Sequence, residues 1–525
     1  MEKGYLCLIL HAHLPFVREP QYEEFLEEHW LFEALVDTYI PLLTVLESLI
    51  KEGVGFSLTL NISPTLSAML EDDFLITRFK KYLDKMIELS EKEIERTKFL
   101  PQFNRLAHFY YYRFTRAKKL FFEKWGANIL KVFKDIQERG FLEIITCCAT
   151  HGYLPLLNLQ EEVIKAQIRV GVSSYRRVFD RNPSGIWLPE CGYFEGLDRF
   201  LKEEGIKYFI LETHGILFAR PRPKFGVYSN YWTPHRVGIF GRDPETSKNV
   251  WSSIEGYPGD YNYREFYRDI GFDLDYDYLR PYIAPTGERI FTGIKYYRIT
   301  GPTENKEIYD PQKALDKAAE HAGNFMFNRE HQINYLNSVL GRKPIIVAPY
   351  DAELFGHWWF EGVDWLNFLI RKIHFDQKVF KMITPSQYLK VYPLTQKIEP
   401  AGSSWGWKGY SEVWLSGEND WIYPHLHRAG ELMVKLAQKE FLGLEKRILN
   451  QMGRELLLAQ SSDWPFIMKT GAFSSYAKKR VIEHLQNFYS LYYQLKRRHK
   501  NELFLRELEE KNNIFPDISY KVFSL

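Results

Sequence analysis

The feature of this sequence that most constrains its fold is a recurring pattern, in which a short apolar run stops at a proline or glycine and polar residues follow. The clearest copy is I-I-V-A-P-Y-D-A-E-L-F-G-H-W-W-F-E-G at residues 345–362. The apolar run 345–348 has the length of a buried strand. Pro349 is expected to end that strand, because proline cannot donate to a sheet ladder. Asp351 and Glu353 follow, as is typical of an active site at the carboxyl ends of barrel strands.

A second copy of the pattern, G-I-W-L-P-E-C-G-Y, lies at residues 185–193 and places Glu190 just after a predicted strand. Either Glu190 or Asp351 alone is well explained as a salt-bridged residue at a strand end. Together, with aromatic residues beside both, they favour a pair of catalytic carboxyl groups over one sugar, as retaining glycosidases need. Spacing alone does not decide between Asp351 and Glu353, which point the same way on an extended chain.

Short apolar runs alternate with helical periodicity along most of the chain, which predicts an α/β fold built as a parallel barrel. Helices are expected over residues 23–51 and 309–340. About seven strands are expected, too few for a regular eightfold barrel. They are predicted at residues 5–10, 55–60, 142–148, from 186, 207–211, 289–295 and from 345.

The sequence pattern divides the chain into four regions. Residues 1–395 are expected to form the barrel, and a charge-rich helical insertion is expected at about 70–135. Residues 219–265 are rich in proline, glycine and aromatics, which predicts a long ordered loop near the site. Residues 396–525 carry helical periodicity without strands, so we expect an all-helical C-terminal domain with a Trp-rich loop at 403–415.

Composition excludes some partners and favours others. The 69 Lys and Arg residues balance 67 Asp and Glu residues, which argues against a nucleic-acid or anionic-membrane surface. Aromatic residues make up 16% of the chain, including 13 Trp, and such rings stack on sugars. Abundant Lys and Glu with few Met hint at a heat-adapted, thermostable protein.

The cysteines and the first apolar run indicate a cytoplasmic protein. None of the four cysteines forms a C-x-x-C pair, so we expect buried free thiols in a reducing compartment. They are Cys7, Cys147, Cys148 and Cys191. The run at residues 5–10 is too short to span a membrane and lacks a cleavage-like sequence after it.

Five histidines follow predicted strands: His11, His13, His151, His214 and His357. They could hold a metal, as in polysaccharide deacetylases on a similar barrel, bind sugar hydroxyls, or be satisfied by backbone groups. No H-x-x-E-H or H-E-x-x-H spacing supports a metal, and sugar binding is the favoured interpretation. Trp30, on a helix, is equally well a core residue, whereas Trp405 and Trp414 lie in a Gly/Ser loop that rarely buries two indoles.

Five ordered sequence blocks resemble glycoside hydrolase family 57. They are H-A-H-L-P-F at residue 11, A-T-H-G-Y-L-P at 149, W-L-P-E-C-G-Y at 187, A-P-Y-D-A-E-L-F-G-H-W-W at 348, and S-S-W-G at 403 with N-D-W-I-Y at 419. Within the family, the chain resembles the 1,4-α-glucan branching enzymes and related α-amylases over nearly its whole length.

The resemblance implies an incomplete (β/α)7 barrel with a helical insertion and an all-helical C-terminal domain. It also implies that Glu190 is the nucleophile, that Asp351 is the acid/base, and that no metal or other cofactor is needed. The substrate would be an α-glucan such as amylose, starch or glycogen. Residues expected to bind it are His11, His13, Trp30, His151, Trp187, His214, His357, Trp358, Trp405, Trp414 and Asp463.

One stretch departs from what the resemblance implies. Branching enzymes of this family resemble one another in a mobile loop whose tyrosine covers the site, but the corresponding stretch here, at about 227–251, is compact. Tyr228 and Tyr231 are its only candidates for that tyrosine. Because water and a sugar hydroxyl compete for the glycosyl-enzyme, loss of such a lid favours hydrolysis.

These observations lead to ranked expectations about function. The first is a retaining enzyme that passes a glucan chain to a 6-hydroxyl, as in glycogen biosynthesis, with α-amylase-type hydrolysis by the same pair as the alternative. A metal-dependent deacetylase using His11, His13 and a carboxylate is a remote alternative, as is a glucan-binding protein without catalysis.

Overall fold

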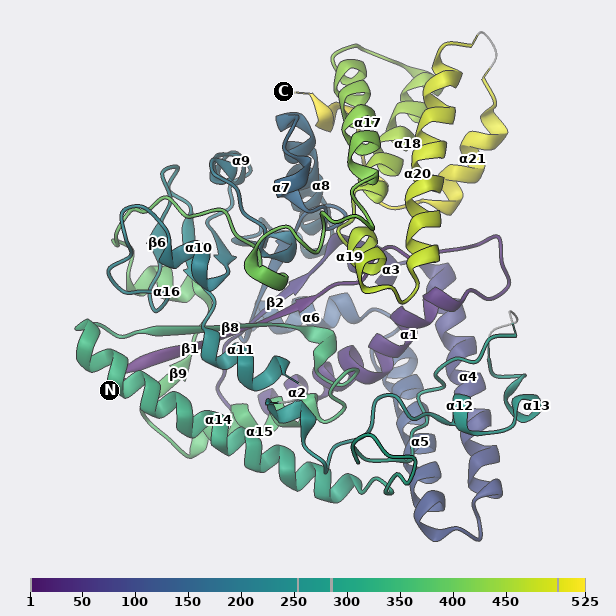
Figure 1. Ribbon diagram of the computed structural model, residues 1–525, viewed down its shortest axis with the longest axis vertical. Coiled ribbons are helices and arrows are strands. Elements are labelled where there is room, and N and C mark those ends of the chain that lie inside the picture. Colours follow the sequence, from purple (N-terminus) through teal and green to yellow (C-terminus); the bar gives the residue numbers. More distant parts are fainter. Residues whose placement is uncertain (1, 253–254, 284–286, 498–499, 525) are drawn as a thin grey trace.

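The computed structural model describes residues 2–252, 255–283, 287–497 and 500–524. Its centre is one curled sheet of nine strands (Figure 1). Their bounds are β1 Gly4–Ala12, β2 Leu58–Ile62, β3 Leu142–Cys147, β4 Gly185–Trp187, β5 Tyr208–Leu211, β6 Tyr231–Trp232, β7 Gly238–Gly241, β8 Ile345–Asp351 and β9 Phe380–Met382.

Seven of the described strands run parallel in the order β7-β5-β4-β3-β2-β1-β8, and the short strand β6 pairs antiparallel with β7. A hydrogen bond of 2.9 Å from Asp243 N to the Val347 carbonyl links the end of β7 to β8, so the curl nearly closes. This architecture confirms the predicted incomplete barrel. The carboxyl ends of its parallel strands meet at one rim.

The sixth parallel strand was wrongly placed by sequence reasoning. The segment Arg289–Lys295 forms no strand; instead, the backbone N–H groups of Thr292 and Gly293 donate to the Asp269 carboxylate. The missing strand is β7, which lies inside the segment 219–265 expected to be a loop, together with β6 and α11 (Pro244–Trp251). With two apolar side chains between two glycines, β7 is too short to show a period.

Pro349 does not end β8, which continues through it to Asp351. Val347 accepts its bond from Asp243 on the side away from β1. Since alternate residues of a strand point their backbone groups the same way, the nitrogen of Pro349 also faces away from β1. No ladder bond is lost there, because β7 has already ended at Gly241.

Long helices surround the sheet and form two projections (Figure 1). One projection is the hairpin of α4 and α5, and the other is the C-terminal group of helices that begins with α17. The main helices are α2 Ile40–Lys51, α4 Asp73–Arg96, α5 Pro101–Lys118, α6 Ile129–Glu138, α8 Glu161–Phe179, α14 Pro311–Leu340, α15 Gly362–Phe375, α17 Ile422–Ala437, α18 Gly443–Ala459, α19 Asp463–Thr470, α20 Ser474–Leu495 and α21 Glu502–Lys511.

Local signals account for the ends of these helices, as α14 illustrates. The Asp310 side chain accepts from the N–H of Gln312, Pro311 occupies the first helical turn, and Gly341 ends the helix at a φ of 63°. A capping carboxylate, an early proline and a left-handed glycine are the usual start and stop signals.

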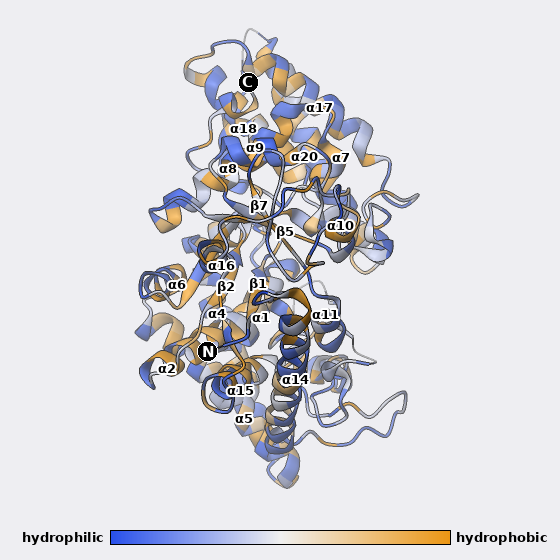
Figure 2. Cartoon of the chain, turned by 90° about the vertical axis from the view of Figure 1, so that its left-hand side faces the viewer, coloured by the Kyte–Doolittle hydropathy of each residue, from blue (hydrophilic) through white to orange (hydrophobic). Residues whose placement is uncertain are grey.

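Apolar residues concentrate in the sheet and under the helices (Figure 2). Every residue of β1 is buried. All four cysteines are buried and free, as predicted. None of the described helices is long and apolar enough to cross a lipid bilayer.

Candidate active site

The predicted site residues meet at the carboxyl rim of the barrel. His11 at the end of β1 pairs in register with Asn61 of β2 on one side and with Asp351 of β8 on the other. The turns after β3 and β4 bring His151 and Glu190 to the same rim. The sheet thus gathers residues that are up to 340 positions apart in the chain.

A cleft of about 1680 Å³ opens over this rim. The ligand pockets of small molecules are usually roughly 300–1000 Å³, so this cleft has room for a polymer segment. The predicted residues that line it are His11, His13, Trp30, His151, Glu190, Asp351, His357, Trp358, Trp405, Trp414 and Asp463.

Glu190 lies in a tight turn that its backbone alone does not favour. Its φ is 60° and that of Cys191 is 50°, a region that costs a non-glycine residue roughly 1–2 kcal/mol. The Trp-rich loop covers this turn: Trp405 N donates to the Glu190 carbonyl at 3.0 Å, and Tyr193 and Ser403 exchange backbone bonds. Backbone strain of this kind is concentrated at functional sites in proteins.

Two side chains from outside the barrel sheet hold the Glu190 carboxyl group. Trp405 Nε1 donates to Oε2 at 2.8 Å, and Ser462 Oγ lies 2.9 Å from Oε1. Burial raises the pKa of Glu190, and the bonds from Trp405 and Ser462 oppose that rise. Ser462 is placed by its own backbone, since its N–H donates to the His151 carbonyl at 3.0 Å.

Asp351 has the opposite surroundings. Among the described residues, no group donates a hydrogen bond to its carboxylate, and its side chain is partly exposed to the cleft. Burial raises the pKa of Asp351 well above its usual range, and the charges of Glu353 and Glu190 raise it further. The protonated form of Asp351 is therefore favoured, and a general acid must be protonated before it can donate to the substrate.

Glu353, the alternative to Asp351, is more enclosed. Its Oε1 accepts from the hydroxyl of Tyr39 and, at 3.2 Å, from the backbone N–H of His13. Burial raises the pKa of Glu353 to about 7. Because this carboxyl group is occupied by protein donors, Asp351 is the better placed of the two to reach a substrate.

A π-helical turn at Leu35–Tyr39 positions Tyr39. Pro41 lies just beyond it and has no N–H to donate back along the helix, a common cause of such turns. Gly356 approaches the freed carbonyl of Asp37 so closely that a Cβ at Gly356 would lie 1.9 Å from that oxygen. This contact explains the glycine in the F-G-H-W-W block.

A chain of hydrogen bonds runs from Asn61 to Glu190. The Asn61 amide nitrogen donates to two carbonyls of β3, so its oxygen faces His11 Nδ1 at 2.6 Å. His11 must then carry its proton on Nδ1. Its Nε2 lies 3.0 Å from His151 Nε2, and His151 Nδ1 lies 2.7 Å from Ser462 Oγ.

Counting protons along this chain links His151 to Glu190. A neutral His151 donates from Nε2 to His11, so its Nδ1 needs the one hydroxyl hydrogen of Ser462. That hydrogen cannot also serve Glu190, so all of these contacts are satisfied only when His11, His151 or Glu190 carries an additional proton. Burial lowers the pKa of both imidazoles and raises that of Glu190, so burial disfavours an additional proton on His11 or His151.

His13 and Asp463 form a second pair at the rim. His13 Nε2 lies 3.1 Å from Asp463 Oδ2, and its Nδ1 lies 2.9 Å from Ser63 Oγ. Burial lowers the pKa of His13, but Asp463 outweighs that effect and the net shift is upward. The pKa of Asp463 is lowered, because His13 outweighs the effect of burial.

One group of described residues has donor atoms close enough for a metal ion. Ligand atoms of His13, His151 and Asp463 lie within 4.8 Å of one another. However, the rings of His13 and His151 are stacked, with centroids 3.9 Å apart and planes 15° apart. Imidazole lone pairs lie in the ring plane, so stacked rings do not point at one ion, and this arrangement suits hydrogen bonding better than tetrahedral coordination.

Two predicted substrate-binding residues do not line the cleft. Trp187 is fully buried and stacks on His11, with centroids 4.8 Å apart. His214 Nε2 lies 2.8 Å from the carbonyl of Gly409 and supports the Trp-rich loop from behind. Both therefore support residues that face the cleft. Trp414 reaches the cleft wall, but it is 1% exposed and stacks on Tyr153. Trp405 remains partly exposed, so the loop buries one of the two indoles and not both.

Neither tyrosine proposed as a lid lines the cleft. Tyr231 is fully buried in β6, and its hydroxyl donates to the Gly226 carbonyl at 2.8 Å. Tyr228 packs against the core at the opposite end of β8, where its carbonyl accepts from Ile345 N. The aromatic residue of this stretch that does line the cleft is Trp251, whose ring centroid is 5.8 Å from that of Trp405.

Comparison with known proteins places these residues in a family. The model of glycosyl hydrolase family 57 matches residues 7–402. The chain belongs to glycosyl hydrolase family 57. A second model, described as the C-terminal part of 1,4-alpha-glucan branching enzyme, matches residues 425–523 of this family 57 protein.

Individual members of family 57 are similar over nearly the full length. A 1,4-alpha-glucan branching enzyme of Thermococcus kodakarensis is 36% identical, with 98% of this chain and 77% of the relative covered. The crystal structure of an alpha-amylase from Thermotoga maritima has a TM-score of 0.93 at 45% identity, covering 99% of each chain. A family 57 branching enzyme from Pyrococcus horikoshii has a TM-score of 0.89 at 35% identity, covering 100% of this chain and 97% of that one.

Proposed function

We propose that this protein is a 1,4-α-glucan branching enzyme in which Glu190 and Asp351 carry out a retaining transfer. The observation that carries the proposal is the pair of carboxyl groups at the rim of one polymer-sized cleft, with opposite surroundings. Similarity to branching enzymes supports the same reaction, since a branching-enzyme model matches the C-terminal region and a branching enzyme matches 98% of the chain.

In the first step, Glu190 attacks C1 of an α-1,4-linked glucose while Asp351 gives its proton to the leaving oxygen. Trp405 and Ser462 fix the attacking oxygens, so little reorganisation is needed when the ester forms.

In the second step, Asp351 acts as the base. Formation of the ester removes the charge of Glu190, one of the groups that raise the pKa of Asp351. Asp351 can therefore take a proton from the incoming 6-hydroxyl of a glucan chain, and the new α-1,6 bond forms with retention. Aromatic side chains such as Trp405, Trp30 and Trp358 are suited to hold the glucose rings.

Hydrolysis of α-1,4-glucans by the same pair is the second candidate. The structural neighbour with a TM-score of 0.93 is an alpha-amylase. Neither lid candidate lines the cleft, so water exclusion falls to other cleft residues such as Trp251. Both reactions share the glycosyl-enzyme and differ in which acceptor reaches it.

The test is incubation of amylose with the purified protein, with new reducing ends and new α-1,6 linkages followed together by proton NMR. A branching enzyme gives many α-1,6 signals for few reducing ends. Reducing ends without α-1,6 signals would instead establish the hydrolase. We place this reaction in the cytoplasm, on the evidence of four free buried thiols.

A further inference from the structure

Four aromatic rings outside the Trp-rich loop line part of the cleft. We call Trp358, Phe266, Phe291 and Phe272 the aromatic strip. Trp358 stacks on Phe266 with centroids 4.4 Å apart and planes 21° apart. Phe266 is 5.7 Å from Phe291, which is 5.0 Å from Phe272. All four rings line the cleft that holds Glu190 and Asp351.

These rings remain accessible, which core packing does not require. Trp358 is 55% exposed and Phe272 is 46% exposed, and the two rings between them are partly exposed. The strip joins two separate parts of the chain, the loop after β8 and the segment around α12 (Ile270–Asp273). A contiguous apolar surface of this kind usually marks a binding site.

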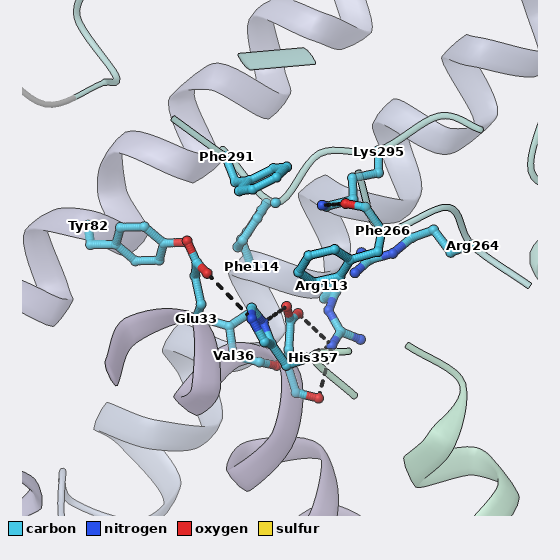
Figure 3. A pocket seen from close by; sticks show the side chains of 12 residues that line it. Glu33, Val36, Tyr82, Arg113, Phe114, Arg264, Phe266, Phe291, Lys295 and His357 are labelled. Carbon is cyan, nitrogen blue, oxygen red and sulfur yellow. Dashed lines mark hydrogen bonds and ion pairs between the residues drawn. The ribbon is translucent and has the colours of Figure 1, made fainter. Parts of the chain in front are cut away.

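The protein supports the strip from its inner side. The buried Lys295 ammonium lies 4.5 Å from the ring centroid of Phe266 and 4.1 Å from that of Phe291, and it donates to the Phe266 carbonyl. Figure 3 shows Lys295 reaching between these two rings. A cation over an aromatic ring fixes its orientation, and Phe266 in turn is stacked against Trp358.

The loop that carries Trp358 is also anchored. The preceding residue, His357, lies between Glu33 and Asp37, with ion-pair distances of 3.9 and 3.6 Å (Figure 3). Arg113 Nη2 donates to Asp37 Oδ1 at 3.0 Å from α5. Because these contacts restrain the loop, the ring of Trp358 should lose little conformational entropy when a ligand stacks on it.

We propose that the aromatic strip is a binding subsite for an α-glucan chain, remote from the bond that is cleaved. It rests on the proposed function, because it takes the polymer itself as ligand. Glucose rings present apolar C–H faces that stack on aromatic side chains, and a row of four rings in a continuous cleft fits a chain of sugars better than one sugar. The strip would therefore make the enzyme prefer long chains.

The test compares chain lengths in the double variant Phe272→Ala/Phe291→Ala, using the ratio of kcat/KM for amylose to that for maltoheptaose. We expect this ratio to fall about fivefold to tenfold, which corresponds to a loss of about 1–1.4 kcal/mol over the two rings together. The control is Phe99→Ala, which removes a ring that is 84% exposed beside the α4–α5 turn, and its ratio should match wild type.

A second measurement keeps the test decisive if the double variant folds poorly. Trp358→Ala and Trp358→Phe are assayed for retardation in native gels containing amylose, in an Asp351→Asn background that prevents turnover. The proposed subsite is supported if Trp358→Phe is still retarded by amylose and Trp358→Ala is not. Equal retardation of both, or an unchanged ratio in a folded double variant, overturns it while wild-type turnover of amylose stands. Failure of wild type to act on any glucan would overturn the proposed function instead.

Discussion

The two candidate catalytic carboxyl groups belong to one rim but to different environments. Glu190 is held by donors from Trp405 and Ser462, both outside the barrel sheet, whereas Asp351 has no donor among the described residues and lies close to Glu353 and Glu190. Hydrogen-bond donors favour a carboxylate, and neighbouring carboxylates favour a carboxylic acid. Hydrogen-bonding and charged partners, and not the type of residue, therefore suit Glu190 to the role of nucleophile and Asp351 to that of acid.

The largest effect is expected when each carboxyl group is removed in turn. We expect Glu190→Gln and Asp351→Asn each to lose about 1000-fold or more in kcat on amylose. An α-glucosyl fluoride donor, whose leaving group needs no proton, separates them. Asp351→Asn should still form the glycosyl-enzyme from it, seen as a mass increase, whereas Glu190→Gln should not. Ester formation on Glu190→Gln would refute the assignment.

A smaller effect is expected from the donors that hold Glu190. Ser462→Ala should lower kcat about 10-fold to 100-fold with little change in KM, because it breaks the link between Glu190 and His151. Ser462→Thr keeps the hydroxyl and serves as the matched control. An equal loss of activity in both variants would show that the hydroxyl group of Ser462 is not the cause of the loss.

The proposed role of Asp351 as the acid can be tested through the pH dependence of kcat/KM. Glu353 raises the pKa of Asp351 when it is charged, above its own pKa of about 7. Glu353→Gln should therefore let Asp351 lose its proton at lower pH, and the alkaline limb of kcat/KM should move to lower pH. Glu361→Gln is the control: Glu361 is also buried, burial likewise raises its pKa to about 7, and Tyr309 holds it. A limb that moves equally in both variants would count against Glu353.

The smallest effect is expected behind the cleft. His214→Ala removes the contact with the Gly409 carbonyl that supports the Trp-rich loop, a bond worth about 0.5–1.5 kcal/mol. Activity should fall only a few-fold and the melting temperature slightly, as measured by calorimetry. A loss as large as that of Ser462→Ala would mean that His214 contributes to the reaction itself.

Sequence reasoning located the rim better than the groups that tune it. His11 and Asp351 could be predicted because each follows an apolar run and parallel strands align their carboxyl ends. Ser462 could not, because its contact with Glu190 spans 272 residues and depends on how the C-terminal helices dock. Its only signal was its place beside Asp463. Tyr39 was missed because a π-helical turn, which no simple period describes, aims it at Glu353.

The 272 residues between Glu190 and Ser462 also matter while the protein is being made. A ribosome adds about 5–20 residues per second, so roughly 15–55 s separate the synthesis of these two residues. During that time the growing chain has Glu190, the candidate nucleophile, but not the Ser462 hydroxyl that contacts it. The hydrogen bonding around Glu190 is therefore completed only after translation has passed residue 462, late in the synthesis of the chain.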